Sequence, residues 1–346
     1  MRLLVDVLHP GHVHFFRHVI EEMTDRGDEV LVTSRRKEVA TELLEAFDIP
    51  HVVLSNQSTG TIGLSAEWAA RTARLASTAR KFSPDVLLGI MGVSIAPVGR
   101  LLRRPALVFY DTEVATQTNR FVYPMAASVI TPDCYDAPVR GNHVTYPGYH
   151  ELAYLHPNRF TPNVDNLAMY GLSPDEPFTV VRFVSWESSH DGGEVALDTA
   201  QKVALVERLR QHGRVVISSE GRLPPSLEPL RLAGPVEHVH HVLAYATLYV
   251  GESSTMASES AVLGTPAIHV AQTSRGYVDD LARRYGLIEH FQPKDFDTAL
   301  AVAEQASAHP DPERVGNARA MMLADKIDVT SWMIEHLDGL RTTPDA

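Results

Sequence analysis

The stretch "VGESSTMASESAVLGTPAIHV", residues 250–270, begins as an apolar strand and continues as a helix. Ser253, Ser254 and Thr255 place small hydroxyls and free backbone N–H groups at the helix start, where a phosphate is favoured. Glu259 follows Thr255 by about one helical turn, so its carboxylate could accept hydrogen bonds from a ribose. We predict that this turn binds the diphosphate and sugar of a nucleotide. A Ser-rich N-cap followed by a solvent-facing Glu is the local alternative.

A second candidate is the loop "VVRFVSWESSHDGG", residues 180–193, which follows another apolar strand. It gathers many hydrogen-bonding groups beside one aromatic ring, which is unusual for a simple connector. We predict a binding loop in which Arg182 contacts a phosphate. The other candidates in the loop are Ser185, Trp186, Ser188, Ser189, His190 and Asp191. Alternatively, Trp186 belongs to the core and the remaining side chains are solvated.

An acid pair follows the strand in "FYDTEVATQTNR". Asp111 or Glu113 could act as a general base facing a cleft. The same two residues could instead cap the next helix, because Asp or Thr followed by Glu suits a helix start. The sequence leaves both interpretations open.

The segment "DVLHPGHVHFF" places a glycine turn between the first strand and the first helix. Gly11 and His12 could contact an anion at the helix start, although the local sequence by itself favours an ordinary strand-to-helix turn. His12 is also a reserve candidate for acid–base chemistry, together with His190. The three histidines His9, His12 and His14 do not indicate a metal site, because no acidic or Cys ligand completes a tetrahedral set.

These residues need elements to position them, and the chain supplies alternating strands and helices. The pattern is typical of βαβ units with a mostly parallel sheet, in which ligands bind at the carboxyl ends of the strands. Strands are expected over 2–8, 29–34, 51–55, 85–90, 105–110, 127–132, 178–184, 214–219, 248–252 and 266–270. Helices are expected over 15–26, 37–47, 66–81, 94–102, 195–212, 240–246, 256–263, 277–285, 298–308 and 312–337.

Composition limits the possible functions. The chain has 346 residues, 44% of them hydrophobic and 21% charged, so we expect two globular domains. A formal net charge of -12 and no Lys/Arg cluster argue against nonspecific nucleic-acid binding. The single cysteine, Cys134, favours a reducing compartment. We expect no signal peptide, because the apolar run in "MRLLVDVLHPG" is too short for one, and no run approaches the roughly 20 apolar residues of a membrane span. We expect a cytoplasmic protein with at most peripheral membrane contact.

The block "ESSTMASESAVLGTP" resembles the strand-turn-helix of B-type glycosyltransferases and of nonhydrolysing nucleotide-sugar 2-epimerases. In both, a Ser or Gly turn meets the diphosphate and a Glu four or five residues before Gly-X-Pro binds the ribose. Glu259 and Gly264-Thr265-Pro266 match that spacing. The turn Pro10-Gly11-His12 similarly resembles the Gly-Gly-His turn of the transferase that makes the second lipid-linked peptidoglycan precursor.

A resemblance over nearly the whole chain is to the family filed as domain of unknown function 354, often labelled a predicted glycosyltransferase. The blocks that carry it, in order, are "HVHFFRHVIEEMTDRGDEVLVTSR", "HPNRFTPNVD", "RFVSWESSHD" and "STMASESAVLGTPAI". The resemblance implies two Rossmann-like domains facing a central cleft, the B-type glycosyltransferase fold. The expected parts are an acceptor-side domain over 1–150, a connection over 151–175, a nucleotide-sugar domain over 176–311, and a helix over 312–346 that crosses back.

The sequence departs from the epimerases in its acids. Their first domain has an acidic pair before an Asn-Arg, whereas Asn119-Arg120 here follows Thr116-Gln117-Thr118. The loop "GIMGVS" also lacks an acid. Because epimerisation must remove and return a proton at one sugar carbon, these losses favour a transferase with one base.

We therefore expect a metal-independent glycosyltransferase without a cofactor, acting in cell-surface glycan or glycolipid synthesis. Its donor would be a nucleotide-sugar, of the uridine diphosphate type, and its acceptor is unspecified. A 2-epimerase is the alternative, and a noncatalytic nucleotide-sugar-binding protein is an alternative of another class.

Overall fold

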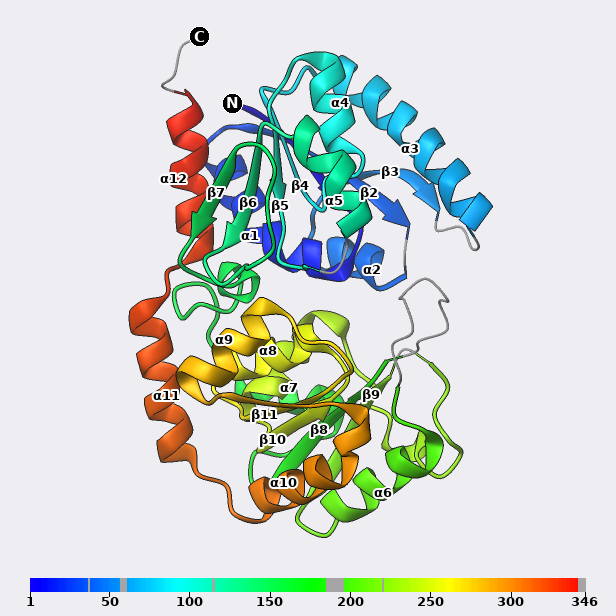
Figure 1. Cartoon of the computed structure of the whole chain (residues 1–346), viewed down its shortest axis with the longest axis vertical. Helices are drawn as coiled ribbons and strands as arrows, with labels where there is room; N and C mark the ends of the chain where they lie inside the picture. The colour runs from blue at the N-terminus through cyan, green and yellow to red at the C-terminus, as the bar shows by residue number, and fades with distance from the viewer. Residues whose placement is uncertain (37, 57–60, 114–115, 185–195, 220, 342–346) are drawn as a thin grey trace. The chain divides into compact units, whose positions relative to one another are not determined.

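The computed structural model describes residues 1–36, 38–56, 61–113, 116–184, 196–219 and 221–341. The chain forms two compact units. Unit 1 contains Met1–Arg159 and Lys326–Ala346, and unit 2 contains Phe160–Asp325. Each unit is built on one parallel sheet with helices on both faces (Figure 1), so the expected α/β class with two sheets is confirmed.

The sheet of unit 1 has seven strands in the order β3-β2-β1-β4-β5-β6-β7. All neighbouring pairs are parallel, and the strand order reverses direction between β1 and β4. The strands are β1 (Arg2–Val7), β2 (Glu29–Arg36), β3 (His51–Asn56), β4 (Val86–Ile90), β5 (Ala106–Phe109), β6 (Ser128–Pro132) and β7 (His143–Tyr146). The central strands are nearly continuous apolar runs, as expected for strands buried on both faces.

Helices cover both faces of this sheet. One face packs on α3 and α4 through an apolar cluster that includes Leu75, Ile95 and Val108. The other face carries α1 and α2, and α12 packs against α1. The helices are α1 (Pro10–Asp25), α2 (Glu38–Ala46), α3 (Thr61–Phe82), α4 (Ile95–Leu102), α5 (Thr116–Val122) and α12 (Val329–Arg341), with short 3₁₀ segments η1 (Tyr123–Met125) and η2 (His150–Ala153).

The sheet of unit 2 has five parallel strands in the order β12-β11-β10-β8-β9. Here the order reverses between β8 and β10. The strands are β8 (Phe178–Phe183), β9 (Arg214–Ser219), β10 (Leu248–Gly251), β11 (Ala267–Val270) and β12 (Ile288–Phe291). Ligands of open α/β sheets bind at the carboxyl ends of strands beside such a reversal, so a ligand of unit 2 is expected at the ends of β8 and β10.

One face of this sheet packs on α6 and α10 through the apolar cluster that contains Val206, Ile268 and Ala303. Helices α7, α8 and α9 lie over the other face (Figure 1). The helices are α6 (Thr199–Leu209), α7 (Val239–Tyr245), α8 (Ser254–Leu263), α9 (Gly276–Tyr285), α10 (Phe296–Ala308) and α11 (Pro312–Asp325); the 3₁₀ segments are η3 (Val164–Tyr170), η4 (Glu228–Leu230), η5 (Val236–His238) and η6 (Pro293–Asp295). None of the helices in the described ranges combines the length and hydropathy required to cross a bilayer.

Several boundaries differ from those expected. The segment over 151–175 is divided between the units at Arg159, and it carries η3 rather than being a bare connection. Arg159 belongs to unit 1 because its guanidinium lies 2.7 Å from Asp328 Oδ2 and also pairs with Glu22. The single helix expected over 312–337 is two helices, α11 in unit 2 and α12 in unit 1.

The first helix begins at Pro10 rather than at residue 15, because His9 caps it: the ring Nδ1 accepts the N–H of Gly11 at 3.2 Å. Two strands, β7 and β12, were missed. Both are four-residue edge strands that contain a histidine, so neither has the apolar run that predicted the others.

Candidate functional site

The turn from β10 to α8 places the predicted hydroxyls at a helix start. Ser253 is the N-cap, and its Oγ accepts the N–H of Met256 at 3.3 Å. Ser254 and Ser253 are half-buried and Thr255 is exposed. The helix ends at Gly264, whose φ of +94° is left-handed and therefore favours glycine. Free N–H groups of the first turn thus lie at the carboxyl end of β10, although one of the three hydroxyls is already used as the cap.

Ser254 has a neutral partner. Its Oγ lies 3.3 Å from Nε2 of His269, at the end of β11. Burial, the neighbouring His290 and Arg275 lower the pKa of His269 to about 3. This imidazole therefore orients the hydroxyl without adding positive charge beside the helix start.

Glu259 is buried in α8 rather than exposed to solvent. Its carboxylate Oε1 lies 2.9 Å from Nε2 of His240 on α7, and the two side chains are only 7% and 2% exposed. The alternative of a solvent-facing Glu is wrong. Its proposed contact with a ribose stays a prediction.

Arg182 lies near the carboxyl end of β8, directly beside the end of β10. Its Nη1 donates to Ser218 Oγ at 2.8 Å, and the side chain is half-buried. A Cβ on Gly251 would lie 2.7 Å from the Cβ and carbonyl oxygen of Arg182. Glycine is therefore required where these two strands end, because any side chain would push them apart. The structure brings Arg182 to the same strand ends as Ser253 and Ser254.

Glu252 is a structural residue that the sequence analysis did not assign. Its Oε2 accepts the N–H of Val184 at 3.0 Å and its Oε1 accepts the N–H of Leu197 at 2.7 Å. One buried carboxylate therefore binds backbone N–H groups on both sides of residues 185–195. Ser185, Trp186, Ser188, Ser189, His190 and Asp191 fall in that segment, outside the described residues. The position of Glu252 directly after β10 was the signal that could have identified it. Sequence alone does not show whether a Glu is buried or exposed.

Unit 1 has its own carboxylate–imidazole pair at the carboxyl end of β5. Asp111 Oδ2 lies 3.0 Å from His150 Nδ1, and its Oδ1 accepts the hydroxyl of Thr112 at 3.0 Å. The Asp111 side chain is 19% exposed and that of His150 is 9% exposed. Phe15 and Tyr146 pack beside the His150 ring, with centroid distances of 4.3 and 6.5 Å. Asp111 is thus held by hydrogen bonds but remains accessible.

The electrostatics of this pair keep Asp111 ionised. Burial would raise the pKa of Asp111, but His150, Thr112 and His12 outweigh it and hold that pKa below its ordinary value. Burial and the neighbouring His9 and His150 hold the pKa of His12 well below 6.5. The geometry therefore presents a carboxylate beside neutral His12.

Gly11 and His12 lie in the first turn of α1. Nδ1 of His12 accepts the N–H of Leu8 at 3.3 Å, so a neutral His12 carries its proton on Nε2 and is a hydrogen-bond donor there. Their proposed role toward an anion stays a prediction.

Glu113 lies two residues after Asp111 and lines a cavity of about 450 Å³ in unit 1. The general-base and helix-cap interpretations of the acid pair are not separated by its position, because residues 114 and 115 before α5 are outside the described ranges. Within those ranges no three His, Cys, Asp or Glu side chains gather as metal ligands would.

His150 is the site residue that the sequence analysis missed. It follows β7 as Asp111 follows β5, so the rule that ligands meet residues after strands would have found it. The strand was not recognised because its four residues, His143–Tyr146, contain no apolar run.

The model of the family described as "Protein of unknown function (DUF354)" matches residues 1–292. The chain belongs to this family. A relative is an uncharacterized protein of Methanocaldococcus jannaschii, 23% identical over an alignment of 329 residues that covers 84% of this chain and 95% of the relative.

Solved structures share the fold across the whole chain. The UDP-GlcNAc 2-epimerase of Neisseria meningitidis, bound to UDP-GlcNAc, has a TM-score of 0.65 at 12% identity, covering 94% of this chain and 99% of the other. The Methanocaldococcus jannaschii UDP-GlcNAc 2-epimerase, in complex with UDP-GlcNAc and UDP, has a TM-score of 0.62 at 10% identity, covering 97% and 100%. Spinosyn forosaminyltransferase has a TM-score of 0.59 at 14% identity, covering 97% and 99%. The fold of this DUF354 member thus resembles the B-type fold of epimerases and glycosyltransferases.

Proposed function

We propose that this protein is a nucleotide-sugar-dependent glycosyltransferase whose acceptor-side base is Asp111. The observation that supports it most is the Asp111–His150 pair, 3.0 Å apart at the carboxyl end of β5, with the carboxylate accessible and ionised. A carboxylate at a strand end of a B-type fold is positioned to accept a proton from an acceptor hydroxyl. His150 is a positioning residue, because its Nδ1 orients the carboxylate.

The donor side is unit 2. Free N–H groups at the start of α8, with Ser253 to Thr255, would meet the diphosphate, and Arg182 would offset its charge. Glu259 would bind the ribose. Two of the similar structures were solved with UDP-GlcNAc, which supports a uridine diphosphate sugar as donor.

In the reaction, the acceptor hydroxyl would attack the anomeric carbon of the sugar and its proton would pass to Asp111. The new carbon–oxygen bond forms as the bond from the anomeric carbon to the diphosphate breaks, and the nucleoside diphosphate leaves with the bonding electrons. The helix start of α8 and Arg182 would stabilise the negative charge that develops on the leaving group. We place this reaction in cell-surface glycan or glycolipid synthesis.

Epimerisation at C2 is a second candidate, favoured by one observation. The two epimerases have TM-scores of 0.65 and 0.62, above the 0.59 of the transferase. Against it, the loop after β4, from Met91 to Ser94, contains no acid. Asp111 and Glu113 are the acids of the loop after β5.

Two measurements test the proposal. Calorimetry with uridine, adenosine and guanosine diphosphates should detect binding, strongest for the uridine compound. Incubation with UDP-GlcNAc in heavy water should leave the C2 proton of the sugar unexchanged. Deuterium at C2 would replace the proposal by epimerisation, and nucleotide binding without release of UDP from any donor and acceptor would indicate a noncatalytic binding protein.

A further inference from the structure

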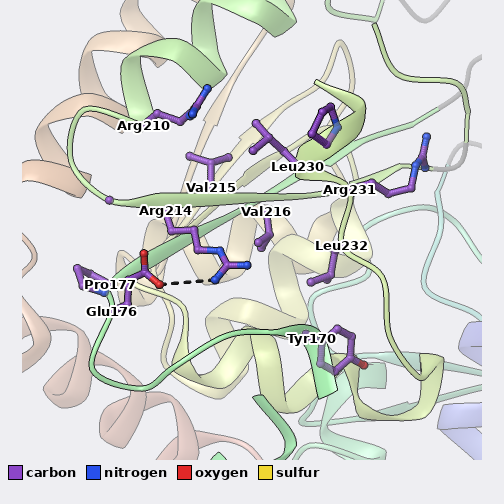
Figure 2. Close-up of a pocket in the computed structure, with 12 residues that line it drawn as sticks. Tyr170, Glu176, Pro177, Arg210, Arg214, Val215, Val216, Leu230, Arg231 and Leu232 are labelled. Carbon is purple, nitrogen blue, oxygen red and sulfur yellow. Dashed lines mark ion pairs between the residues drawn. The ribbon is translucent and has the colours of Figure 1, made fainter. Parts of the chain in front are cut away.

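Two cavities in this protein are lined by arginines, and they differ in how the guanidinium groups are neutralised. The cavity of unit 2 holds about 380 Å³ against edge strand β9 (Figure 2). Arg214 there donates to the carbonyl of Gly171 at 2.6 Å and lies 3.6 Å from Glu176. Arg231 pairs with Glu228 at 2.5 Å and donates to two carbonyls. Two of the three arginines that line this cavity, Arg214 and Arg231, therefore already bind acceptors within the protein.

The cavity of unit 1 is different. It holds about 450 Å³ and is lined by Arg120 of α5 and Arg140 of the loop between β6 and β7. Both side chains are exposed, and neither makes a hydrogen bond or ion pair with any residue that the structure describes. In a chain with a net charge of -12, these two guanidinium groups outnumber the one carboxylate, Glu113, that lines the same cavity. Such a pair is the usual recognition element for a phosphate or carboxylate.

Asn119, which lines the same cavity, has a buried hydrogen-bond acceptor. Asn119 is 8% exposed, and its amide oxygen has no partner among the described residues. A buried acceptor without a partner is costly in a folded protein, so it marks a place where a ligand donor would be stabilised. A hydroxyl group supplies such a donor. The cavity thus offers binding groups for a ligand that carries both an anionic group and a hydroxyl.

Two lining residues connect the cavity to the chain beside the proposed base. Glu113 lines it and lies two residues after Asp111. Tyr123, another lining residue, packs edge-on against Tyr110, which immediately precedes Asp111, with a centroid distance of 5.8 Å. Its hydroxyl hydrogen-bonds that of Tyr135 at 3.0 Å. Burial and this hydrogen bond raise the pKa of Tyr123, so the phenol stays neutral and adds no charge.

We propose that this cavity binds the acceptor, and that the acceptor is a hydroxyl compound carrying a phosphate or carboxylate held by Arg120 and Arg140. Asn119 receives a hydroxyl of the same molecule. This inference rests on the proposed function, since the bound anion is taken to be part of the group that is glycosylated.

Titration of the full chain with phenyl phosphate, benzoate and neutral benzyl alcohol tests the inference. Phenyl phosphate represents a phosphate ligand and benzoate a carboxylate ligand. The compound that binds with higher affinity identifies which of the two anionic groups the cavity prefers. We expect both anions to bind more tightly than benzyl alcohol. The double variant Arg120→Gln/Arg140→Gln should bind the preferred anion about ten- to hundred-fold more weakly, because charge-assisted hydrogen bonds are lost. Glu113→Gln should bind it more tightly, because a neighbouring negative charge is removed.

Arg100→Gln is the matched control, because Arg100 is an exposed arginine of α4 that does not line the cavity. Thermal melts of all variants establish folding. Equal anion affinity in the wild type and the double variant, or benzyl alcohol binding as tightly as the anions, overturns the inference.

A further titration is made in saturating uridine diphosphate. Unchanged affinity for the anion separates this cavity from the donor site, whereas competition would show that the arginines bind the donor phosphate and would overturn the acceptor assignment. Because the first titration contains no nucleotide, it succeeds or fails independently of donor binding.

Discussion

The carboxylate–imidazole pair at the candidate site of unit 1 and the one in unit 2 have almost the same length, yet the two pairs have different surroundings. Asp111 and His150 lie 3.0 Å apart in unit 1, and Glu259 and His240 lie 2.9 Å apart in unit 2. The Asp111 side chain is 19% exposed, whereas that of Glu259 is 7% exposed. Asp111 lies in the loop after β5, whereas the Glu259–His240 pair joins helix α8 to helix α7.

The difference teaches that a carboxylate–histidine pair does not define a role by itself. A base must reach the proton that it removes, which requires an accessible oxygen. A residue that binds a fixed sugar must instead be rigid, which burial and a second anchored side chain provide. Under the proposed function, Asp111 transfers the proton and Glu259 positions the ligand, and the variants below test whether the two roles separate in this way.

The largest effect is expected for Asp111→Asn. The amide cannot accept the acceptor proton, so turnover should fall about a hundred-fold or more while donor affinity and thermal stability change little. Release of uridine diphosphate from UDP-GlcNAc in the presence of an acceptor measures it. Glu113→Gln is the matched control and should retain most of the turnover. Full activity of both variants would remove this acid pair from the mechanism and direct attention to His12, His190 and Asp191.

Glu259→Ala should act on binding instead of turnover. Removing charge-assisted hydrogen bonds to a ribose costs roughly 1.5 to 3 kcal/mol, which is about ten- to hundred-fold in affinity for uridine diphosphate. Calorimetry measures the affinity, and Glu259→Gln should lie between alanine and wild type because it can still contact His240. A lower melting temperature with unchanged affinity would show that this pair only joins α7 to α8.

The fold was predictable because parallel strands buried on both faces leave long apolar runs. The central strands over 86–90 and 248–251 were recognised in this way, whereas β7 and β12 at sheet edges were not. The division at Arg159 depends on a long-range ion pair with Asp328, which no local pattern shows. Contacts between residues far apart in sequence therefore set the limits of the units.

The site was predictable only where chemistry follows a recognised strand. Asp111, Arg182 and Ser253 were found in this way. His150 was missed with its strand, and the burial of Glu259 was not visible because its partner lies 19 residues earlier on another helix. The sequence indicated which residue types lie at the strand ends. It did not indicate which side chains form hydrogen-bonded pairs in the folded protein.

Glu252→Ala should lower stability without touching the chemistry. It leaves the buried N–H groups of Val184 and Leu197 without their acceptor, at about 1–3 kcal/mol for each unsatisfied group. Thermal denaturation measures the loss, and Glu252→Gln should retain part of the stability through its single amide oxygen. The control Glu207→Ala, at an exposed position of α6, should change stability by about 0.5 kcal/mol or less. Equal melting temperatures for all of these variants would show that the two hydrogen bonds of Glu252 do not stabilise the fold.

The smallest effect at neutral pH, and the one that distinguishes a positioning residue from a base, is expected for His150→Gln. His150 is the strongest influence that lowers the pKa of Asp111 against the effect of burial. An acid with a depressed pKa stays ionised to lower pH, so replacing His150 should raise that pKa and move the acidic limb of the pH–rate profile to higher pH. Near neutral pH Asp111 remains ionised in both proteins, so turnover there should fall only a few-fold.

Thr112→Val removes a weaker hydrogen bond to the same carboxylate, so it should shift the acidic limb in the same direction by less. Initial rates from about pH 4 to 8 decide between the two roles for His150, with melts at each pH confirming that the variants stay folded. If His150 were itself the base, His150→Gln would lose turnover at every pH as Asp111→Asn does, and no limb would move. A shifted limb with nearly normal turnover at neutral pH is the outcome that only a positioning role produces, because it requires the proton to be carried by Asp111.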